Sequence, residues 1–234
     1  MELDDTPRVT PSMLRRADEC CHRRLAHEHR GGKTWGNRVG DARFAVSNRL
    51  SADARLAHAE ADVVRAEAFV DPRELAPEQR RVYDTATRSY LQRFGARPGR
   101  VADLGWRTPL PQLGVELVGD VGIALDLPDG GHELRRLSLG GRRTGSPLLD
   151  PVDVRVALVR TAAWAPDHIR IVAVDLLEQE AIELEPDVTT EREEALAWIG
   201  ERVDTITRHA AHAQPRPGNE CGTCAFVAGC SAHG

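Results

Sequence analysis

The amino-acid sequence predicts an α/β or α+β fold in which helices pack against a sheet. Helical patterns come first, short strand-like runs follow, and then come a helix, two further strands and a long helix. Hydrophobic residues make up 41% and charged residues 29% of the 234 residues, which is typical of a globular protein. This length suits one domain with three parts: helices at 10–95, a sheet core at 100–185, and a long helix with a cysteine-rich tail at 189–234.

The first predicted helix begins at Thr10-Pro11-Ser12, because a hydroxyl N-cap is followed by proline in the first turn. We expect it to end at about Gly31-Gly32. Cys21 belongs to its apolar stripe, whereas Cys20 is rotated away from that stripe. The members of the stripe recur at spacings of three and four: Leu14, Ala17, Cys21 and Leu25.

Two more helices are predicted in the first part of the chain. A loop at 33–48 precedes a helix at 51–68, and a third helix occupies 71–94. His58 lies off the apolar side of the second helix, so we expect it at the surface. The residues that mark this apolar side are Leu56, Val63 and Val70.

Short strand-like runs and a turn then define the predicted sheet. A hairpin turn is expected at 128–131, from its Pro-Asp-Gly-Gly sequence. A capping box of Thr190 and Glu193 starts the last helix, which fades at 209–212. The other predicted elements are strands at 101–106, 115–118, 121–127 and 132–139, a helix at 152–164, and a second hairpin of strands at 169–176 and 181–184.

Charge and cysteine usage limit the partners and the compartment. The net charge of −5 argues against general nucleic-acid affinity, but residues 7–49 hold ten basic and four acidic residues. Residues 171–204 hold eleven acidic and two basic residues. The basic segment is either a phosphate-contacting surface or a solvated helix face. No apolar run approaches the ~18 residues of a membrane span, and the acidic start has no signal-peptide pattern. We therefore expect a cytoplasmic protein with no membrane partner, in which cysteines bind metal rather than form disulfides.

The cysteines form the most specific pattern in the chain. Three of the five lie in a C-x2-C-x5-C run, and the other two are adjacent near the N-terminus. A site of four thiolates would need one sulfur from the N-terminal pair, so it would tie the two ends of the chain together. The alternative is that these are ordinary thiols. The residues concerned are Cys20, Cys21, Cys221, Cys224 and Cys230.

The cysteine tail resembles that of RecB-like PD-(D/E)XK nucleases that carry an iron–sulfur cluster, such as the AddB nuclease domain and CRISPR-associated adaptation exonucleases. The tail motif of that family is matched by Pro217, Cys221, Cys224, Phe226 and Cys230. At the N-terminus, Ser12-Met13-Leu14 followed by 20–25 is similar to the segment that supplies the fourth ligand. The resemblance implies a [4Fe-4S] cluster on Cys21 (or Cys20), Cys221, Cys224 and Cys230. Zinc on the same thiolates is the alternative.

The resemblance also implies a PD-(D/E)XK mixed sheet flanked by helices, but with a degenerate catalytic motif. The family motif has an aspartate in G-x-[IV]-D and, on the next strand, an acid and a lysine in [IV]-D-x-K-[TS]-G. Ser138 and Gly140 stand at the acidic and lysine positions, and the only lysine of the chain is Lys33. The weak candidates that remain for catalysis are His58, Asp120 and Asp126.

These observations together predict a catalytically inactive, nuclease-like protein that binds DNA as an accessory subunit of a helicase or nuclease. Phosphates would be contacted by five arginines of the first helix: Arg15, Arg16, Arg23, Arg24 and Arg30. One alternative is an active metal-dependent nuclease with a site around His58, Asp120, Asp126 and Glu133. The other is a protein-interaction module that docks through its acidic 171–204 segment.

Overall fold

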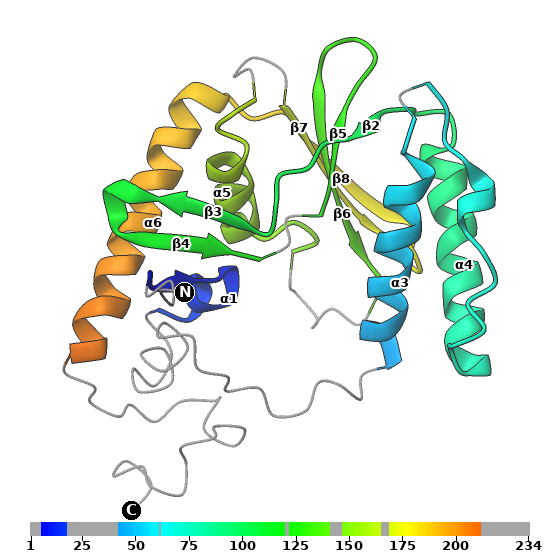
Figure 1. Cartoon of the computed structure of the whole chain (residues 1–234), viewed down its shortest axis with the longest axis horizontal. Helices are drawn as coiled ribbons and strands as arrows, with labels where there is room; N and C mark the ends of the chain where they lie inside the picture. The colour runs from blue at the N-terminus through cyan, green and yellow to red at the C-terminus, as the bar shows by residue number, and fades with distance from the viewer. Residues whose placement is uncertain are drawn as a thin grey trace, which may run out of the picture. The chain divides into compact units, whose positions relative to one another are not determined.

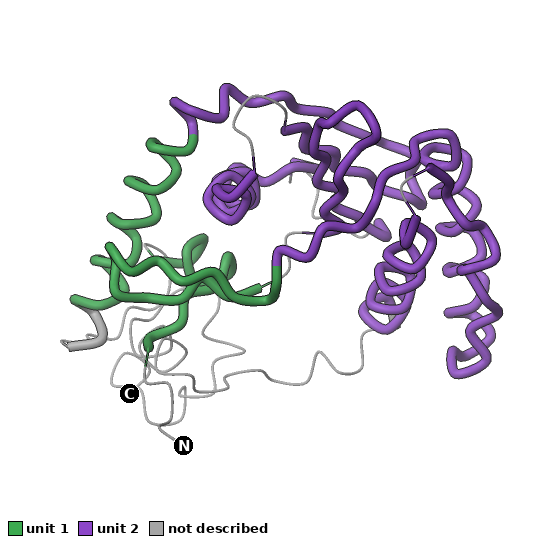
Figure 2. The backbone as a smooth tube through the Cα atoms, turned by 45° about the horizontal axis from the view of Figure 1, so that its top comes forward, with its two compact units in different colours: residues 1–38, 105–120, 192–234 green, residues 39–104, 121–191 purple. Residues whose placement is uncertain are grey.

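The computed structural model in Figure 1 describes six stretches of the chain: 6–17, 42–60, 62–119, 122–140, 147–164 and 169–211. Two compact units can be distinguished, and each is made of segments that are separated in the sequence (Figure 2). The first unit comprises Met1–Arg38, Gly105–Asp120 and Arg192–Gly234. The second comprises Val39–Leu104 and Val121–Glu191.

The first unit contains a three-stranded mixed sheet in the order β1-β4-β3. The first strand is parallel to β4, and β3 is antiparallel to it. Helix α1 begins as predicted, because the Thr10 hydroxyl accepts a hydrogen bond from the Met13 amide at 3.2 Å. The elements are β1 (Arg8–Val9), α1 (Pro11–Arg16), β3 (Arg107–Leu110), the 3-10 turn η3 (Pro111–Leu113), β4 (Val115–Val118) and most of α6 (Val188–Ala211).

The second unit contains a five-stranded mixed sheet in the order β2-β5-β6-β7-β8. The β5–β6 and β7–β8 pairs are antiparallel hairpins. Strand β7 is parallel to β6, and helix α5 (Pro151–Arg160) connects them, as a parallel pair requires. The strands are β2 (Arg100–Val101), β5 (Ile123–Asp126), β6 (His132–Ser138), β7 (Ile169–Asp175) and β8 (Glu180–Leu184).

Helices α3 (Ala42–Ala57) and α4 (Pro77–Phe94) join this sheet in the main hydrophobic core. The short 3-10 turn η2 (Ala66–Ala68) lies between them in the sequence. Aromatic rings also pack together in this core: the centroid of the Tyr90 ring lies 5.0 Å from that of Phe94 and 5.5 Å from that of Phe69. The core residues are Val46, Leu50, Ala54, Leu75, Tyr83, Ala86, Tyr90, Phe94, Ile123, Leu125, Leu139, Val172, Val174 and Leu176.

The predicted α/β class is therefore confirmed at the level of two mixed sheets with helices packed against a sheet. Among the described residues, none of the helices has the combination of length and apolar character needed to cross a membrane. Most predicted elements of the sheet core are also found, with ends shifted by a few residues. These are the strands at 115–118, 123–126, 132–138, 169–175 and 180–184 and the helix at 151–160.

The position and apolar side of the second predicted helix were wrong. Helix α3 covers Ala42–Ala57, so residues 42–48 are helical rather than a loop, and the helix ends eleven residues before the predicted end at 68. Its buried side is formed by Val46, Leu50 and Ala54, which are spaced by four residues. The residues predicted to be inside are all exposed: Leu56 by 60%, Val63 by 48% and Val70 by 56%. Because Ala54 is small, its apolar character did not indicate in the sequence that it lies on the buried side of the helix.

Three other element boundaries were wrong. Helix α4 begins at Pro77, six residues after the predicted start at 71. The strand predicted at 101–106 is replaced by the short β2 and, after a gap, by β3. Pro109 lies in β3, which is tolerated because β3 is an edge strand. Helix α6 begins at Val188, so the predicted Thr190–Glu193 capping box does not form its start. Instead, the Asp187 amide donates to the Glu191 carboxylate at 3.1 Å.

Candidate functional site

A buried arginine organises the polar groups on one side of the second sheet. Glu133 and Arg135 are two residues apart on β6, so their side chains share a face. Arg135 is fully buried, and its Nε donates to a Glu133 carboxylate oxygen at 2.5 Å. Its guanidinium also lies 4.1 Å from the centroid of the Phe94 ring, a cation–π geometry. The buried positive charge is thus paired with a carboxylate and an aromatic face.

The remaining guanidinium nitrogens bind three segments of the unit. One nitrogen lies 2.8 Å from Nε2 of His58 and 3.2 Å from the Tyr90 hydroxyl. The other donates to the main-chain carbonyl of Arg97 at 3.1 Å. Arg135 therefore links the end of α3, the helix α4 and the loop after α4 to the centre of the sheet.

His58 is buried, not exposed as predicted. Helix α3 ends at Ala57, so the helical stripe does not determine where the His58 side chain points. Its Nδ1 lies 3.0 Å from the Gly99 carbonyl. Since a guanidinium can only donate, Nε2 accepts from Arg135, and the proton of the neutral ring resides on Nδ1. Burial, and secondarily the charge of Arg135, lower the pKa of His58 to about 4.

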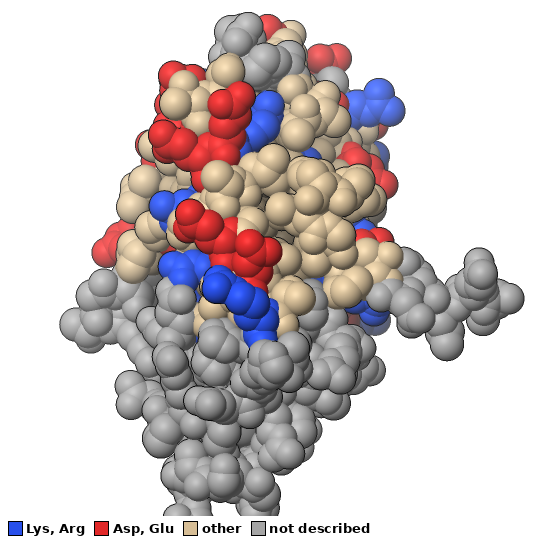
Figure 3. All heavy atoms as spheres, turned by 90° about the vertical axis from the view of Figure 1, so that its left-hand side faces the viewer, with Lys and Arg blue, Asp and Glu red and all other residues tan. Residues whose placement is uncertain are grey.

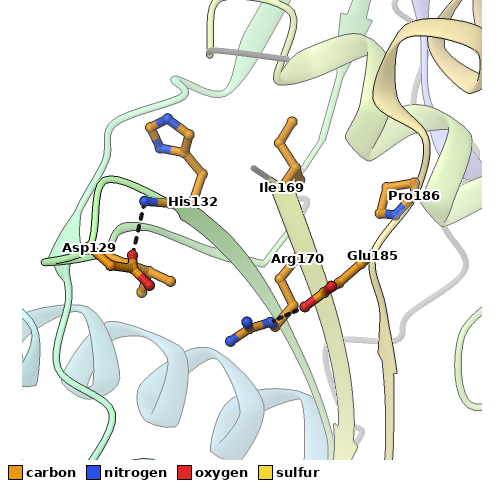
Figure 4. Close-up of a pocket in the computed structure, with 8 residues that line it drawn as sticks. Asp129, His132, Ile169, Arg170, Glu185 and Pro186 are labelled. Carbon is orange, nitrogen blue, oxygen red and sulfur yellow. Dashed lines mark hydrogen bonds and ion pairs between the residues drawn. The ribbon is translucent and has the colours of Figure 1, made fainter. Parts of the chain in front are cut away.

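The network reaches the surface through Arg170. The second carboxylate oxygen of the buried Glu133 lies 3.5 Å from the Arg170 guanidinium, which also binds Glu185 at 3.0 Å. Arg170 and Glu185 border a cavity of about 330 Å³ at one end of the sheet (Figure 4). His132 rises from β6 on the other side of this cavity. The lining residues are Leu127, Asp129, Gly131, His132, Ile169, Arg170, Glu185 and Pro186.

Asp126 takes part in a different interaction. It ends β5, and its carboxylate lies 2.9 Å from Nδ1 of His132, the residue opposite it in the hairpin. The His132 ring is stacked on Trp164, with centroids 4.5 Å apart and an angle of 7° between the planes. The described contacts join His58 and Glu133 through Arg135, but they do not bring Asp126 to either residue. Three of the four residues of the active-nuclease alternative are thus divided between two places, and the fourth, Asp120, lies outside the described residues.

The end of β6, where the resemblance would place the acid and the lysine, is fixed by a buried carboxylate. Asp175 is fully buried at the end of β7, beside the end of β6. It accepts from the Ser138 hydroxyl at 3.3 Å and from the Gly140 amide at 3.0 Å. It also accepts from the amides of Leu177 and Glu178, both at 3.1 Å. Ser138 and Gly140 therefore act here as hydrogen-bond donors to a turn-forming aspartate.

A glycine with no space for a side chain precedes β5, where the resemblance would place the first aspartate. Counted from Gly119, G-x-[IV]-D places its aspartate at position 122, where the chain has glycine. Gly122 has a φ of +107°, and an added Cβ would lie 2.2 Å from the carbonyl oxygen of Arg135. Residues with a side chain rarely adopt this backbone conformation, and a substitution there would be strained. A carboxylate cannot occupy position 122 unless the backbone of the hairpin moves.

The other predicted site residues are only partly described. Arg15 and Arg16 lie in the last turn of α1, and both are half-buried. Within the described stretches, no group of three or more His, Cys, Asp or Glu residues could hold a metal ion. The residues that lie outside the described part are Asp120, the arginines Arg23, Arg24 and Arg30, and the cysteines Cys20, Cys21, Cys221, Cys224 and Cys230.

The prediction from sequence missed Arg135, Tyr90 and Asp175. The sequence did contain a signal for Arg135. Glu133 and Arg135 are two residues apart on a predicted strand, so they lie on one face, where opposite charges can pair. No local pattern marks Asp175, which ends an apolar strand and resembles an ordinary turn aspartate.

Comparison with protein-family models gives no match, and comparison with curated proteins gives none either. The likeness to cluster-bearing nucleases therefore depends on the motifs quoted above.

Replacing Arg135 with methionine keeps much of the side-chain volume and removes the buried cation. We expect the free energy of unfolding to fall by about 3–5 kcal/mol, because Glu133 loses its closest partner inside the core. The same change at Arg88, which is exposed on α4, should cost less than about 0.5 kcal/mol. Denaturant unfolding of both variants measures the difference. Equal, small losses for the two variants would contradict the structural role of Arg135.

The neutral state of His58 predicts a pH dependence of stability. The folded chain keeps His58 unprotonated down to about pH 4, whereas the unfolded chain binds the proton near pH 6.5. The contribution is therefore fully present above about pH 6.5 and is lost as the pH falls towards 4, by roughly 3 kcal/mol in total. The stability of His58→Gln should decline less over this interval, as measured by urea unfolding at several pH values. Parallel pH profiles for the two proteins would show that His58 is not the responsible group.

Proposed function

We propose that this protein is a catalytically inactive, nuclease-like protein that binds DNA as an accessory subunit. The proposal depends on one observation: the three positions where the nuclease motif would have two acids and a lysine hold other residues. Phosphodiester hydrolysis by this family requires carboxylates for a divalent cation and a lysine beside them. Here these positions are Gly122, which has no space for a side chain, and Ser138 and Gly140, which donate to Asp175.

The topology of the second unit supports the nuclease-like part of the proposal. An antiparallel hairpin, a crossover helix and a parallel strand follow one another as β5, β6, α5 and β7. This arrangement agrees with the PD-(D/E)XK mixed sheet that the resemblance implies. The motif positions lie at the start of β5 and at the end of β6, on neighbouring strands.

The polar groups that remain are poorly suited to an active nuclease. Glu133 is buried and paired with Arg135, so a metal ion at this carboxylate would have to compete with an adjacent fixed positive charge. His58 faces the same guanidinium. Asp126 is paired with His132. These contacts favour a structural role for the three side chains.

The cofactor proposed is a [4Fe-4S] cluster on Cys21 (or Cys20), Cys221, Cys224 and Cys230, with zinc as the alternative. Its support is the cysteine spacing alone. The cluster would hold the N-terminal helix against the tail, and thereby fix the arginines Arg15, Arg16, Arg23, Arg24 and Arg30 as a phosphate-binding group.

A second candidate function, docking of a basic protein partner, is favoured by one observation on α6. Four exposed residues of this helix are acidic and form what we call its acidic stripe: Glu193, Glu194, Glu201 and Asp204. Figure 3 looks onto the side of the molecule that carries α6 and displays groups of acidic side chains there. This acidic stripe would repel a DNA backbone and attract a basic surface.

A salt-titrated binding assay with single- and double-stranded DNA, and with Mn²⁺ present, tests the function. We expect binding that weakens as salt rises and no cleavage above that of an Asp120→Ala/Asp126→Ala double variant. Charge reversal of Arg23 and Arg24 should lower the affinity by about tenfold or more. Charge reversal of Arg81 and Arg88, both exposed on α4, is the matched control and should have little effect.

Two outcomes would contradict the DNA-binding proposal. Metal-dependent cleavage that is abolished in the Asp120→Ala/Asp126→Ala variant would identify an active nuclease. Lack of DNA binding even at low salt would leave the acidic stripe of α6 as the better-supported functional surface.

The cofactor is tested by purifying the protein without oxygen. We expect a brown protein with absorption near ~400 nm, typical of iron–thiolate clusters, and loss of the colour in Cys224→Ser. Comparing Cys20→Ser with Cys21→Ser identifies the fourth ligand, which we expect to be Cys21. A colourless protein with one equivalent of zinc would refute the iron–sulfur proposal and leave the four-thiolate site intact.

A further inference from the structure

Strand β8 is an edge strand with an exposed apolar residue at its centre. It pairs with β7 on one side, and within the described part of the chain no strand pairs with its other side. Ile182, the middle residue, is 44% exposed. An edge of this kind leaves main-chain N–H and C=O groups directed away from the sheet, where another strand can bind them.

The usual protection of such an edge, a row of free charges, is weakened here. Glu183 is bound by Arg97 at 2.9 Å and by Arg93 at 3.7 Å, so its negative charge is compensated within the unit. Glu183 and Ala181 lie opposite Val172 and Val174, which are core residues. Ile182 therefore points to the other face of the sheet, away from these arginines.

The sequence of β8 is self-complementary in an antiparallel pair. If two copies are related by a two-fold axis at Ile182, this residue lies opposite the same residue of the second copy. Glu183 then lies opposite Ala181, and Glu180 lies opposite Leu184. No like charges are directly opposed, and two exposed isoleucines cover each other.

We propose that β8 pairs with β8 of a second copy of this chain. The contact is isologous, because the same five residues act on both sides of the axis. It extends the two five-stranded sheets into one continuous sheet of ten strands. The strands are short, and the contact is smaller than the ~1,000 Å² of a stable interface, so we expect a dissociation constant in the micromolar range or above.

Sedimentation velocity of the full-length protein without DNA tests this proposal, over a concentration range of about 5–500 µM. The wild type should shift from monomer to dimer with concentration. Ile182→Lys and Ile182→Glu should each weaken the dimer by about tenfold or more, because two like charges then face each other at the axis. An equimolar mixture of the two variants should associate again, since lysine then faces glutamate. Leu56→Lys, at a comparably exposed apolar residue of α3, is the control and should dimerise as the wild type does.

Three results would overturn the proposal. The first is a wild-type protein that stays monomeric over the whole concentration range. The second is an Ile182→Lys variant that dimerises as well as the wild type. The third is a mixture of the lysine and glutamate variants that fails to associate although the wild type does, because the axis would then not pass through Ile182.

Discussion

The second unit depends on one buried positive charge. Arg135 is held in the core by a carboxylate, an aromatic face, a neutral imidazole and a main-chain carbonyl, which come from β6, α4, the end of α3 and the loop after α4. A buried charge without such partners would be strongly destabilising. The packing of α3 and α4 on the sheet and the neutral state of His58 are therefore not independent features. Both features involve the same guanidinium, although burial is the larger cause of the neutral state of His58.

A buried ion pair does not by itself make a protein more stable, because a well-packed apolar pair of the same volume can give the same free energy of unfolding. What Arg135 supplies here is a defined geometry. The N–H bonds of its planar guanidinium point in fixed directions. The ends of α3 and α4 must therefore lie where their hydrogen-bond acceptors are in line with these N–H bonds. Asp175 has a similar effect at the far end of β6, where one carboxylate fixes the strand end and the turn that follows β7.

The sheet core was predictable from sequence, but the contacts within it were not. The runs around β5, β6, β7 and β8 were recognisable from apolar residues and turns, because these signals are local. The buried side of α3 was not recognisable, because Ala54 packs against the sheet while the larger Leu56 does not, and only the tertiary fold decides this. The same limit applies to His58, whose burial depends on Gly99 and Arg135, far away in the sequence. The sequence did show that Ser138 and Gly140 stand where the resemblance would place an acid and a lysine. That Asp175 binds both residues could be learned only from the paired ends of β6 and β7.

The geometry at Gly122 has a consequence for protein engineering. At position 122 the obstacle is the main chain, because the glycine lies against the carbonyl of Arg135 at a distance that leaves no space for even one carbon atom. An aspartate placed there would have to be accompanied by a rebuilt β5–β6 hairpin. A single substitution to aspartate at position 122 is therefore not accommodated by this main chain, whatever residues are placed at 138 and 140.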